Sequence, residues 1–168
     1  GPATEKGFYY DIDLGDTKLS DEDLADIEAE MKKITKENLP IRPYVLSRED
    51  AIAHMQDLGE KYKVEHIGDL PEDAEISFFK QGDYVDMCTG PHLCYTKALK
   101  AFKITGQSGA YWKNDKNNKM LTRIYATAFT KKADMEEYLL QVEEAKKRDN
   151  NKLGRELELF TTSDVIGQ

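Results

Sequence analysis

The sequence predicts an α+β domain in which helices and short antiparallel strands are followed by a long charged helix. Three observations support this class. Two segments that begin with a capping serine carry apolar residues at helical spacing. A run of short apolar segments separated by turn residues comes next, as in an antiparallel sheet. After residue 130 the apolar spacing returns to that of a helix.

The first expected elements are a strand and a helix. Gly7–Leu14 alternates apolar and acidic residues toward its end, as a half-buried strand does. Ser20, with Asp23 three residues later, forms a capping pattern that opens the helix. The apolar positions that follow at helical spacing are Leu24, Ile27, Met31 and Ile34. We expect Pro40 to mark the end of this helix.

A short strand and a second helix come next. Ile41–Leu46 reads as a strand, and Pro43 places it at the edge of a sheet because proline cannot donate a ladder hydrogen bond. Ser47, with Asp50 three residues later, opens the second helix, and Gly59 closes it.

Short strands dominate the middle of the chain. We expect them at Lys63–Ile67, Ile76–Lys80, Tyr84–Met87, Ala101–Thr105, Ala110–Trp112 and Leu121–Phe129. The last of these is the clearest, because it is rich in β-branched and aromatic residues. Turn residues separate the strands at Gly82-Asp83, Gly90-Pro91 and Asn117-Asn118. A long charged helix then runs from Thr130 to about Leu153.

The composition indicates a cytoplasmic, well-solvated domain. Of the 168 residues, 39% are hydrophobic and 33% are charged. No apolar run approaches the roughly 20 residues of a membrane helix, so no membrane partner is expected. The two cysteines, Cys88 and Cys94, are too few for a disulfide framework, and we expect reduced thiols.

Charge is unevenly distributed along the chain. The net charge of −8 argues against a general nucleic-acid binder, which would have a basic face. Seven cations nevertheless fall within 27 residues, opposed only by Asp115: Lys97, Lys100, Lys103, Lys113, Lys116, Lys119 and Arg123. An ordinary solvated surface explains this cluster as well as contact with an RNA end does, so both interpretations stay open.

The segment Asp86–His92 (DMCTGPH) brings a carboxylate, a thiol and an imidazole within seven residues. The turn at Gly90-Pro91 could place Cys88 and His92 at one pocket mouth. The pair could bind zinc, or Cys88 could be a nucleophile activated by His92. Alternatively, Cys88 is a small buried residue and His92 caps the turn, which the motif alone favours. The remaining candidates for a zinc site are Cys94, His54 and His66.

A wider pattern resembles a known family. YVDMCTGPH (Tyr84–His92), followed by NNKMLTRIYATAFT (Asn117–Thr130), is similar to the second additional domain shared by threonyl- and alanyl-tRNA synthetases. The bacterial threonyl version fits best, because GFYYDIDL, GEKYKV (Gly59–Val64) and GAYWKNDKNNKML (Gly109–Leu121) resemble it too. Glu143–Phe160 resembles the helix and crossover that lead into the catalytic core of the synthetase.

The resemblance implies three segments: an editing domain over residues 1–130, a linker helix over 131–154, and the start of the catalytic domain over 155–168. It also implies that the chain is a fragment of a larger threonine–tRNA ligase, a homodimer whose catalytic domain uses ATP and zinc. The implied partners are the acceptor end of tRNA(Thr) and the remaining domains of the synthetase. The chain itself is not expected to form an aminoacyl-adenylate or to hold a cofactor, zinc excepted.

The implied activity is hydrolysis of the ester in mischarged seryl-tRNA(Thr). Serine lacks one methyl group of threonine, and one methyl separates two substrates by only about 1–3 kcal/mol, so a second site is needed. The alternative is a non-catalytic module that binds the tRNA acceptor arm or spaces the domains of the synthetase. A free-standing deacylase is disfavoured, because Arg155–Gln168 looks like the beginning of another domain.

The family's site residues can be carried over individually. Cys88 and His92 match its C-x-x-x-H pair, which lines the pocket and orients the attacking water or the substrate. Asp86 matches a carboxylate that holds the serine amino or hydroxyl group, and Lys63 a lysine that binds the tRNA end or steadies the developing negative charge. An ion pair inside the fold is the structural alternative for Asp86 and Lys63. Thr89 stands where the family often has arginine.

An H-x-x-x-H motif of the family precedes the segment that resembles GFYYDID, and this chain starts after it. The related alanyl-type editors hold zinc with all four positions. Any metal expected here therefore has only Cys88 and His92 as ligands.

Overall fold

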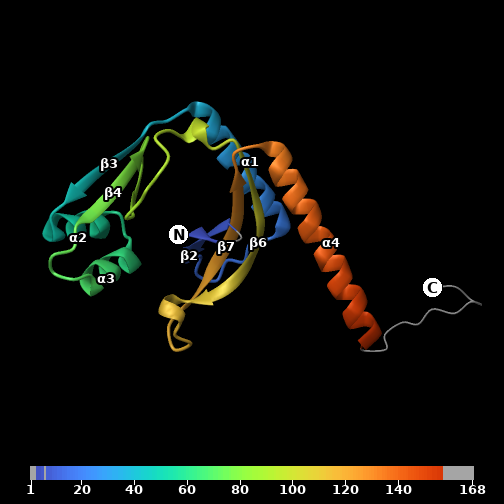
Figure 1. Ribbon diagram of the computed structural model, residues 1–168. Helices are drawn as coiled ribbons and strands as arrows, with labels where there is room; N and C mark the ends of the chain where they lie inside the picture. The colour runs from blue at the N-terminus through green and yellow to red at the C-terminus, as the bar shows by residue number, and fades with distance from the viewer. Residues whose placement is uncertain (1–2, 6, 157–168) are drawn as a thin grey trace, which may run out of the picture. The chain divides into compact units, whose positions relative to one another are not determined.

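The computed structural model describes residues 3–5 and 7–156. The chain forms two compact units (Figure 1). Unit 1 combines Gly1–Asp16 with Lys100–Gln168, and unit 2 is Thr17–Leu99. Each unit contains an antiparallel sheet and helices, so the predicted α+β class is confirmed.

Unit 1 is built on a four-stranded antiparallel sheet with the strand order β1-β2-β7-β6. Its elements are β1 (Ala3–Thr4), β2 (Gly7–Ile12), β6 (Ala101–Tyr111), η2 (Trp112–Asn114), β7 (Met120–Phe129) and α4 (Lys132–Glu156). The β2 strand pairs with β7 from Phe8↔Ala126 to Ile12↔Thr122. Gly7 has a φ of +141°, and a Cβ there would lie 2.1 Å from the Ala126 carbonyl oxygen. The close approach of the two strands therefore requires glycine at this position.

The structure corrects the expectation of separate strands at Ala101–Thr105 and Ala110–Trp112. Both belong to the single strand β6, which pairs with β7 over its length and has a register shift between Ile104 and Gly106. Gly106 has a φ of +153°, which glycine adopts readily. A glycine within a strand pattern can mark either a break or a bulge, and here it marks a bulge.

The helix α4 confirms the long charged helix expected after Thr130. Its apolar side packs on the sheet of unit 1: Met135 is buried, and the Tyr138 ring lies 5.3 Å from that of Phe129. Of the segment expected to begin the catalytic domain, residues 157–168 lie outside the described residues. None of the helices in the described part of the chain has the length and hydropathy that a membrane span requires.

Unit 2 contains a three-stranded antiparallel sheet with the order β3-β4-β5. Its elements are α1 (Asp21–Glu37), β3 (Ile41–Leu46), α2 (Arg48–Asp57), α3 (Lys61–Asp69), β4 (Ile76–Gln81), β5 (Tyr84–Met87) and η1 (Thr96–Ala98). The predicted helix starts are confirmed. Ser20 and Asp23 form a capping box on α1, and the Ser47 side chain accepts a hydrogen bond from the Asp50 amide on α2. Pro43 lies on the edge strand β3, as predicted.

The core of unit 2 lies between its sheet and the helices α2 and α3, which cover one face of the sheet (Figure 1). Phe78, Met55 and Ile67 are almost completely buried there. Burying side chains of this size contributes about 1.5–3 kcal/mol each relative to leaving them exposed. The core therefore fixes which face of β4 points toward the helices.

The strand predicted at Lys63–Ile67 is wrong, because these residues lie in the helix α3. Val64 packs against the core and Ile67 is fully buried. Their separation of three residues fits one face of a helix, while Glu65 and His66 between them are exposed. A run of five residues with only two apolar side chains is too short to distinguish the period of a helix from that of a strand.

Candidate functional site

Three of the four predicted site residues lie on or just after the edge strand β5. Asp86 belongs to β5, and Cys88 and His92 follow it on either side of the turn at Gly90-Pro91. Asp86 pairs in register with Phe79 of β4. Because Phe78 points into the core, the alternation of side chains places Phe79 and Asp86 on the opposite face of the sheet.

Lys63 and Asp86 form an ion pair with an Nζ–Oδ1 distance of 2.8 Å. The Lys63 ammonium also donates a hydrogen bond of 3.4 Å to the Met87 carbonyl oxygen, and the Met87 amide donates one of 2.8 Å to Asp86 Oδ1. The side chains of the pair are 26% and 22% exposed, so solvent still reaches both charges. The structure thus brings the predicted lysine and carboxylate together, from α3 and β5.

His92 lies against an aromatic ring. Its imidazole stacks on Phe79, with ring centroids 3.7 Å apart and an interplanar angle of 24°. His92 is an exposed residue, but its neighbours partly remove the imidazole from water, which lowers the pKa of His92 below its ordinary value; the nearby negative charge of Asp86 opposes this shift. The imidazole is therefore predominantly neutral near pH 7, which is the form that accepts a proton.

Cys88 is held through its backbone. Its amide donates a hydrogen bond of 3.1 Å to the Ser77 carbonyl oxygen, and the Ser77 hydroxyl donates one of 2.6 Å to the Cys88 carbonyl oxygen. Its thiol is half-buried, and Cys94 is exposed; both are free cysteines. Among the described residues no hydrogen bond joins the Cys88 thiol to His92. The described residues therefore show no contact that would activate the Cys88 thiol.

The described residues do not fit a zinc site. They contain no group of three or more His, Cys, Asp and Glu side chains arranged to hold a metal ion. His54 lies on α2, where its Nε2 is 3.4 Å from the Tyr44 hydroxyl and its ring meets Phe78 edge-on. His66 lies on α3, so neither histidine joins Cys88 and His92 in a ligand set. Zinc sites use three or four protein ligands, and the described residues bring no third ligand to Cys88 and His92.

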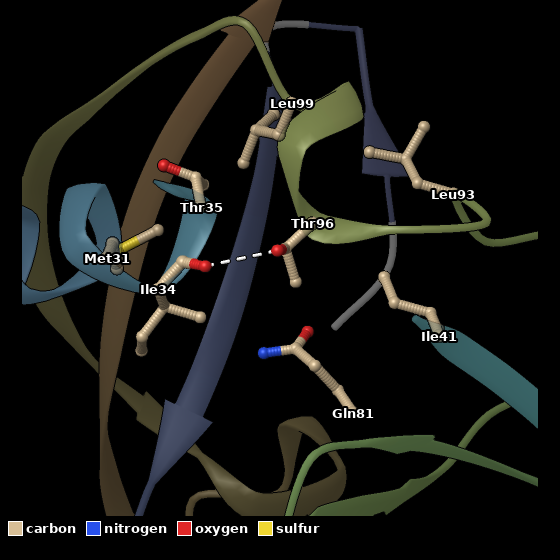
Figure 2. A pocket seen from close by; sticks show the side chains of 8 residues that line it. All are labelled: Met31, Ile34, Thr35, Ile41, Gln81, Leu93, Thr96 and Leu99. Carbon is tan, nitrogen blue, oxygen red and sulfur yellow. Dashed lines mark hydrogen bonds between the residues drawn. The ribbon is translucent and has the colours of Figure 1, made fainter. Parts of the chain in front are cut away.

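Unit 2 also has a mainly apolar pocket of about 190 Å³ (Figure 2). It is lined by Met31, Ile34, Thr35, Ile41, Gln81, Leu93, Thr96 and Leu99. Figure 2 shows the Thr96 hydroxyl directed at the Ile34 carbonyl oxygen, to which it donates a hydrogen bond of 3.1 Å. None of the four predicted site residues lines this pocket. No local pattern in the sequence predicts this pocket, because its walls come from segments far apart along the chain.

The cluster of seven cations is partly neutralised. Arg123 on β7 forms two hydrogen bonds of 2.7 Å with the Asp11 carboxylate on β2, and it stacks on the Tyr9 ring. Lys119 forms an ion pair of 2.6 Å with Asp13. Lys97 belongs to unit 2 and the other six cations to unit 1. The local excess of positive charge seen in the sequence is therefore smaller in the folded unit 1.

Residues 76–125 match the family model described as the threonyl and alanyl tRNA synthetase second additional domain. The matched segment runs from β4 into β7 and contains Asp86, Cys88 and His92. The resemblance predicted from Tyr84–His92 and Asn117–Thr130 is confirmed. The class of protein is thus one that carries this synthetase domain.

Curated relatives narrow the family further. A threonine–tRNA ligase of Clostridioides difficile is 60% identical over 160 residues, which are 95% of this chain and 25% of the relative. Those of Clostridium botulinum and Halalkalibacterium halodurans are 56% and 54% identical over 168 residues, 100% of this chain and 26% of each relative. The chain spans about a quarter of the length of the curated relatives it matches. Over that quarter it belongs to the threonine–tRNA ligase family.

Proposed function

We propose that this chain hydrolyses the ester that joins serine to the 3′ end of mischarged tRNA(Thr), as the editing part of a threonyl-tRNA synthetase. The observation that carries the proposal is the arrangement around Asp86. Its carboxylate is paired with the Lys63 ammonium and lies in register with Phe79, on whose ring the imidazole of His92 stacks, all within unit 2. All of these residues except Lys63 lie in the segment that matches the synthetase domain. A base, a cation and a carboxylate together suit hydrolysis of an ester that carries an amino group.

His92 acts in this proposal as the general base. It takes a proton from water while the water oxygen bonds to the ester carbonyl carbon. The bond from that carbon to the ribose oxygen then breaks, and His92 returns the proton to the ribose oxygen. The products are free serine and a tRNA with a free 3′ end. Lys63 steadies the negative charge that develops on the carbonyl oxygen.

Asp86 receives the substrate's amino group in this proposal, and Cys88 forms part of the wall beside it. A carboxylate that already accepts the Lys63 ammonium can hold a second cation on its other side. Discrimination against threonine then depends on a wall that leaves no room for one more methyl group, worth about 1–3 kcal/mol.

In the whole protein this activity would correct the product of an ATP-dependent ligase. The partners are then the acceptor end of tRNA(Thr) and the other domains of a cytoplasmic, homodimeric synthetase. Residues 1–130 form the editing domain, 131–154 the linker to the catalytic domain, and 155–168 the start of that domain.

A second candidate is a non-catalytic module that binds or spaces the tRNA acceptor arm. The observation that favours it is the ion pair itself, since Lys63 and Asp86 satisfy each other's charge as a purely structural pair would. The two candidates differ in whether the chain hydrolyses its ligand or only binds it.

Single-turnover deacylation separates the two candidates. Seryl-tRNA(Thr) and threonyl-tRNA(Thr) are incubated with the chain, with His92→Ala, and with a longer chain that carries the family's H-x-x-x-H motif. Binding of the uncharged tRNA is measured in parallel. Serine-selective hydrolysis that His92→Ala abolishes supports editing. If neither the chain nor the longer version hydrolyses seryl-tRNA while both bind tRNA, the chain is a binding module and not an editing domain.

A further inference from the structure

Phe79 lies where its side chain can fix the orientation of the His92 imidazole. In β4 the side chains alternate, so Phe78 is buried under the helices while Phe79 lies on the other face of the sheet. Phe79 pairs in register with Asp86 on one side and with Pro43 on the other. Side chains of directly paired residues are neighbours on one face, so the ring lies next to the carboxylate of the proposed site.

The contact between Phe79 and His92 is close and nearly parallel. The ring centroids are 3.7 Å apart and the planes are inclined by 24°. A face-on contact uses the flat side of the imidazole and leaves both ring nitrogens at its edge, where hydrogen bonds form. A hydrogen-bonding neighbour in the same place would instead occupy one of these nitrogens.

Gly90 makes this contact sterically feasible. A Cβ at this position would lie 2.9 Å from Phe79 Cζ and 3.5 Å from His92 Nδ1. The residue also has a φ of +69°, a region that glycine adopts without strain. The turn therefore passes directly over the ring pair, and a side chain there would push the two rings apart.

We propose that Phe79 is a positioning residue for His92: its ring fixes the plane of the imidazole beside Asp86, and Gly90 leaves the room for this stacking. The inference rests on the proposed editing function and adds to it a residue outside the C-x-x-x-H motif. A general base works only when its nitrogen is held within hydrogen-bond reach of the proton that it takes. A displacement of about 1 Å can lower the rate by a factor of about 100.

The test combines a spectroscopic and a kinetic readout on the 168-residue chain. Because the two rings stack, we expect the ring current of Phe79 to shift the carbon-bound ring protons of His92 upfield in the NMR spectrum. We expect Phe79→Leu to remove this shift and to lower the maximal single-turnover rate on seryl-tRNA(Thr) by about tenfold to hundredfold. The tRNA concentration that gives half the maximal rate should stay within about twofold, because substrate binding is retained.

Three further variants complete the test. Phe79→Tyr keeps an aromatic ring and should retain the upfield shift and most of the rate. Gly90→Ala should disturb both, since its Cβ would meet the Phe79 ring. Tyr84→Leu is the matched control, because it removes an exposed ring from β5, two residues from Asp86. It should leave the His92 shifts and the rate unchanged.

The positioning role is overturned if Phe79→Leu leaves the His92 shifts unchanged, or if it removes them and hydrolysis continues at the original rate. If neither the chain nor the longer version that carries the H-x-x-x-H motif hydrolyses seryl-tRNA, the proposed function is overturned instead. The His92 shifts in Phe79→Leu and Phe79→Tyr then still decide whether the ring contact exists.

Discussion

Each unit of this chain contains a carboxylate paired with a cation next to an aromatic ring, and the two pairs are built differently. In unit 1, Asp11 and Arg123 face each other across β2 and β7 and share two hydrogen bonds of 2.7 Å. In unit 2, Asp86 lies on an edge strand and meets the single ammonium of Lys63 at 2.8 Å. The first pair is a planar fork held by two strands, and the second is a single contact between a strand and a helix.

The difference separates a structural pair from a site that can accept a substrate. The Arg123 guanidinium donates both of its hydrogen bonds to Asp11, and its flat face lies over the Tyr9 ring. The ion pair with Asp11 raises the pKa of Arg123 above its ordinary value. Lys63 is a point charge on a flexible stem, and it can rearrange when a ligand arrives. Unit 2 is stabilised by the core face of its sheet, which leaves the opposite face, with Phe79 and Asp86, for chemistry.

The largest effect on stability is expected from a substitution in the apolar core of unit 2. Phe78→Ala should lower the free energy of unfolding by about 3–5 kcal/mol, because the ring is fully buried and its removal leaves a cavity. Urea unfolding followed by far-UV circular dichroism measures the loss. Phe78→Leu, which keeps most of the apolar volume, should lose less. Equal stability of Phe78→Ala and the unmodified chain would show that the helix-facing side of the sheet does not hold unit 2.

The next effect is expected in unit 1. Asp11→Asn should lower the free energy of unfolding by about 1.5–3 kcal/mol, since it leaves the Arg123 guanidinium without its charged partner. Urea unfolding of this variant is compared with that of Arg123→Lys, which keeps the charge but loses the fork. A loss below about 0.5 kcal/mol, within the range of ordinary surface substitutions, would contradict the structural role.

The ion pair of unit 2 should contribute less to stability. Lys63→Gln is expected to change the free energy of unfolding by no more than about 1 kcal/mol, because solvent reaches both partners and a lysine pair of this kind is weak. The same variant should lower single-turnover hydrolysis of seryl-tRNA(Thr) by about tenfold or more, since it removes the charge beside the reacting carbonyl. Strong destabilisation with unchanged hydrolysis would make this pair structural as well.

The smallest expected effect is the contribution of His92 to the dependence of stability on pH. Burial lowers the pKa of His92, so the unfolded chain binds this proton at a higher pH than the folded chain does. The folded state therefore loses stability as the pH falls below about 6.5, and above that value the contribution is constant. Urea midpoints at about pH 7.5 and about pH 5.5 should differ less in His92→Gln than in the unmodified chain. His54 and His66 remain in both proteins, so the difference isolates His92.

Local signals in the sequence were sufficient for most elements. The serine caps at Ser20 and Ser47 and the edge proline Pro43 act within a few residues, and the structure has all three where they were expected. The strand prediction for Lys63–Ile67 was wrong because the segment is short. Its two inward residues, Val64 and Ile67, lie three apart, and in so short a run this spacing does not distinguish a strand from a helix. The prediction of two strands on either side of Gly106 was wrong because pairing with β7, and not the glycine, decides whether the strand continues.

The site shows a similar limit. The chemistry of Asp86, Cys88 and His92 is visible in one short segment, and Lys63 was found only through the family resemblance. Phe79 was missed because its role depends on which face of β4 points away from the core, and that choice is fixed by contacts with α2 and α3. No pattern of neighbouring residues carries this information.

Hydrolysis of seryl-tRNA(Thr) by Asp86→Asn and Asp11→Asn, measured side by side in single turnovers at a temperature where both are folded, tests the contrast between the two units most directly. We predict that Asp86→Asn loses at least about tenfold in rate, as removal of a group that touches the reacting substrate does, while Asp11→Asn stays within about twofold of the unmodified chain. Equal rates in the two variants, or a larger loss in Asp11→Asn, would contradict the assignment of the chemistry to unit 2.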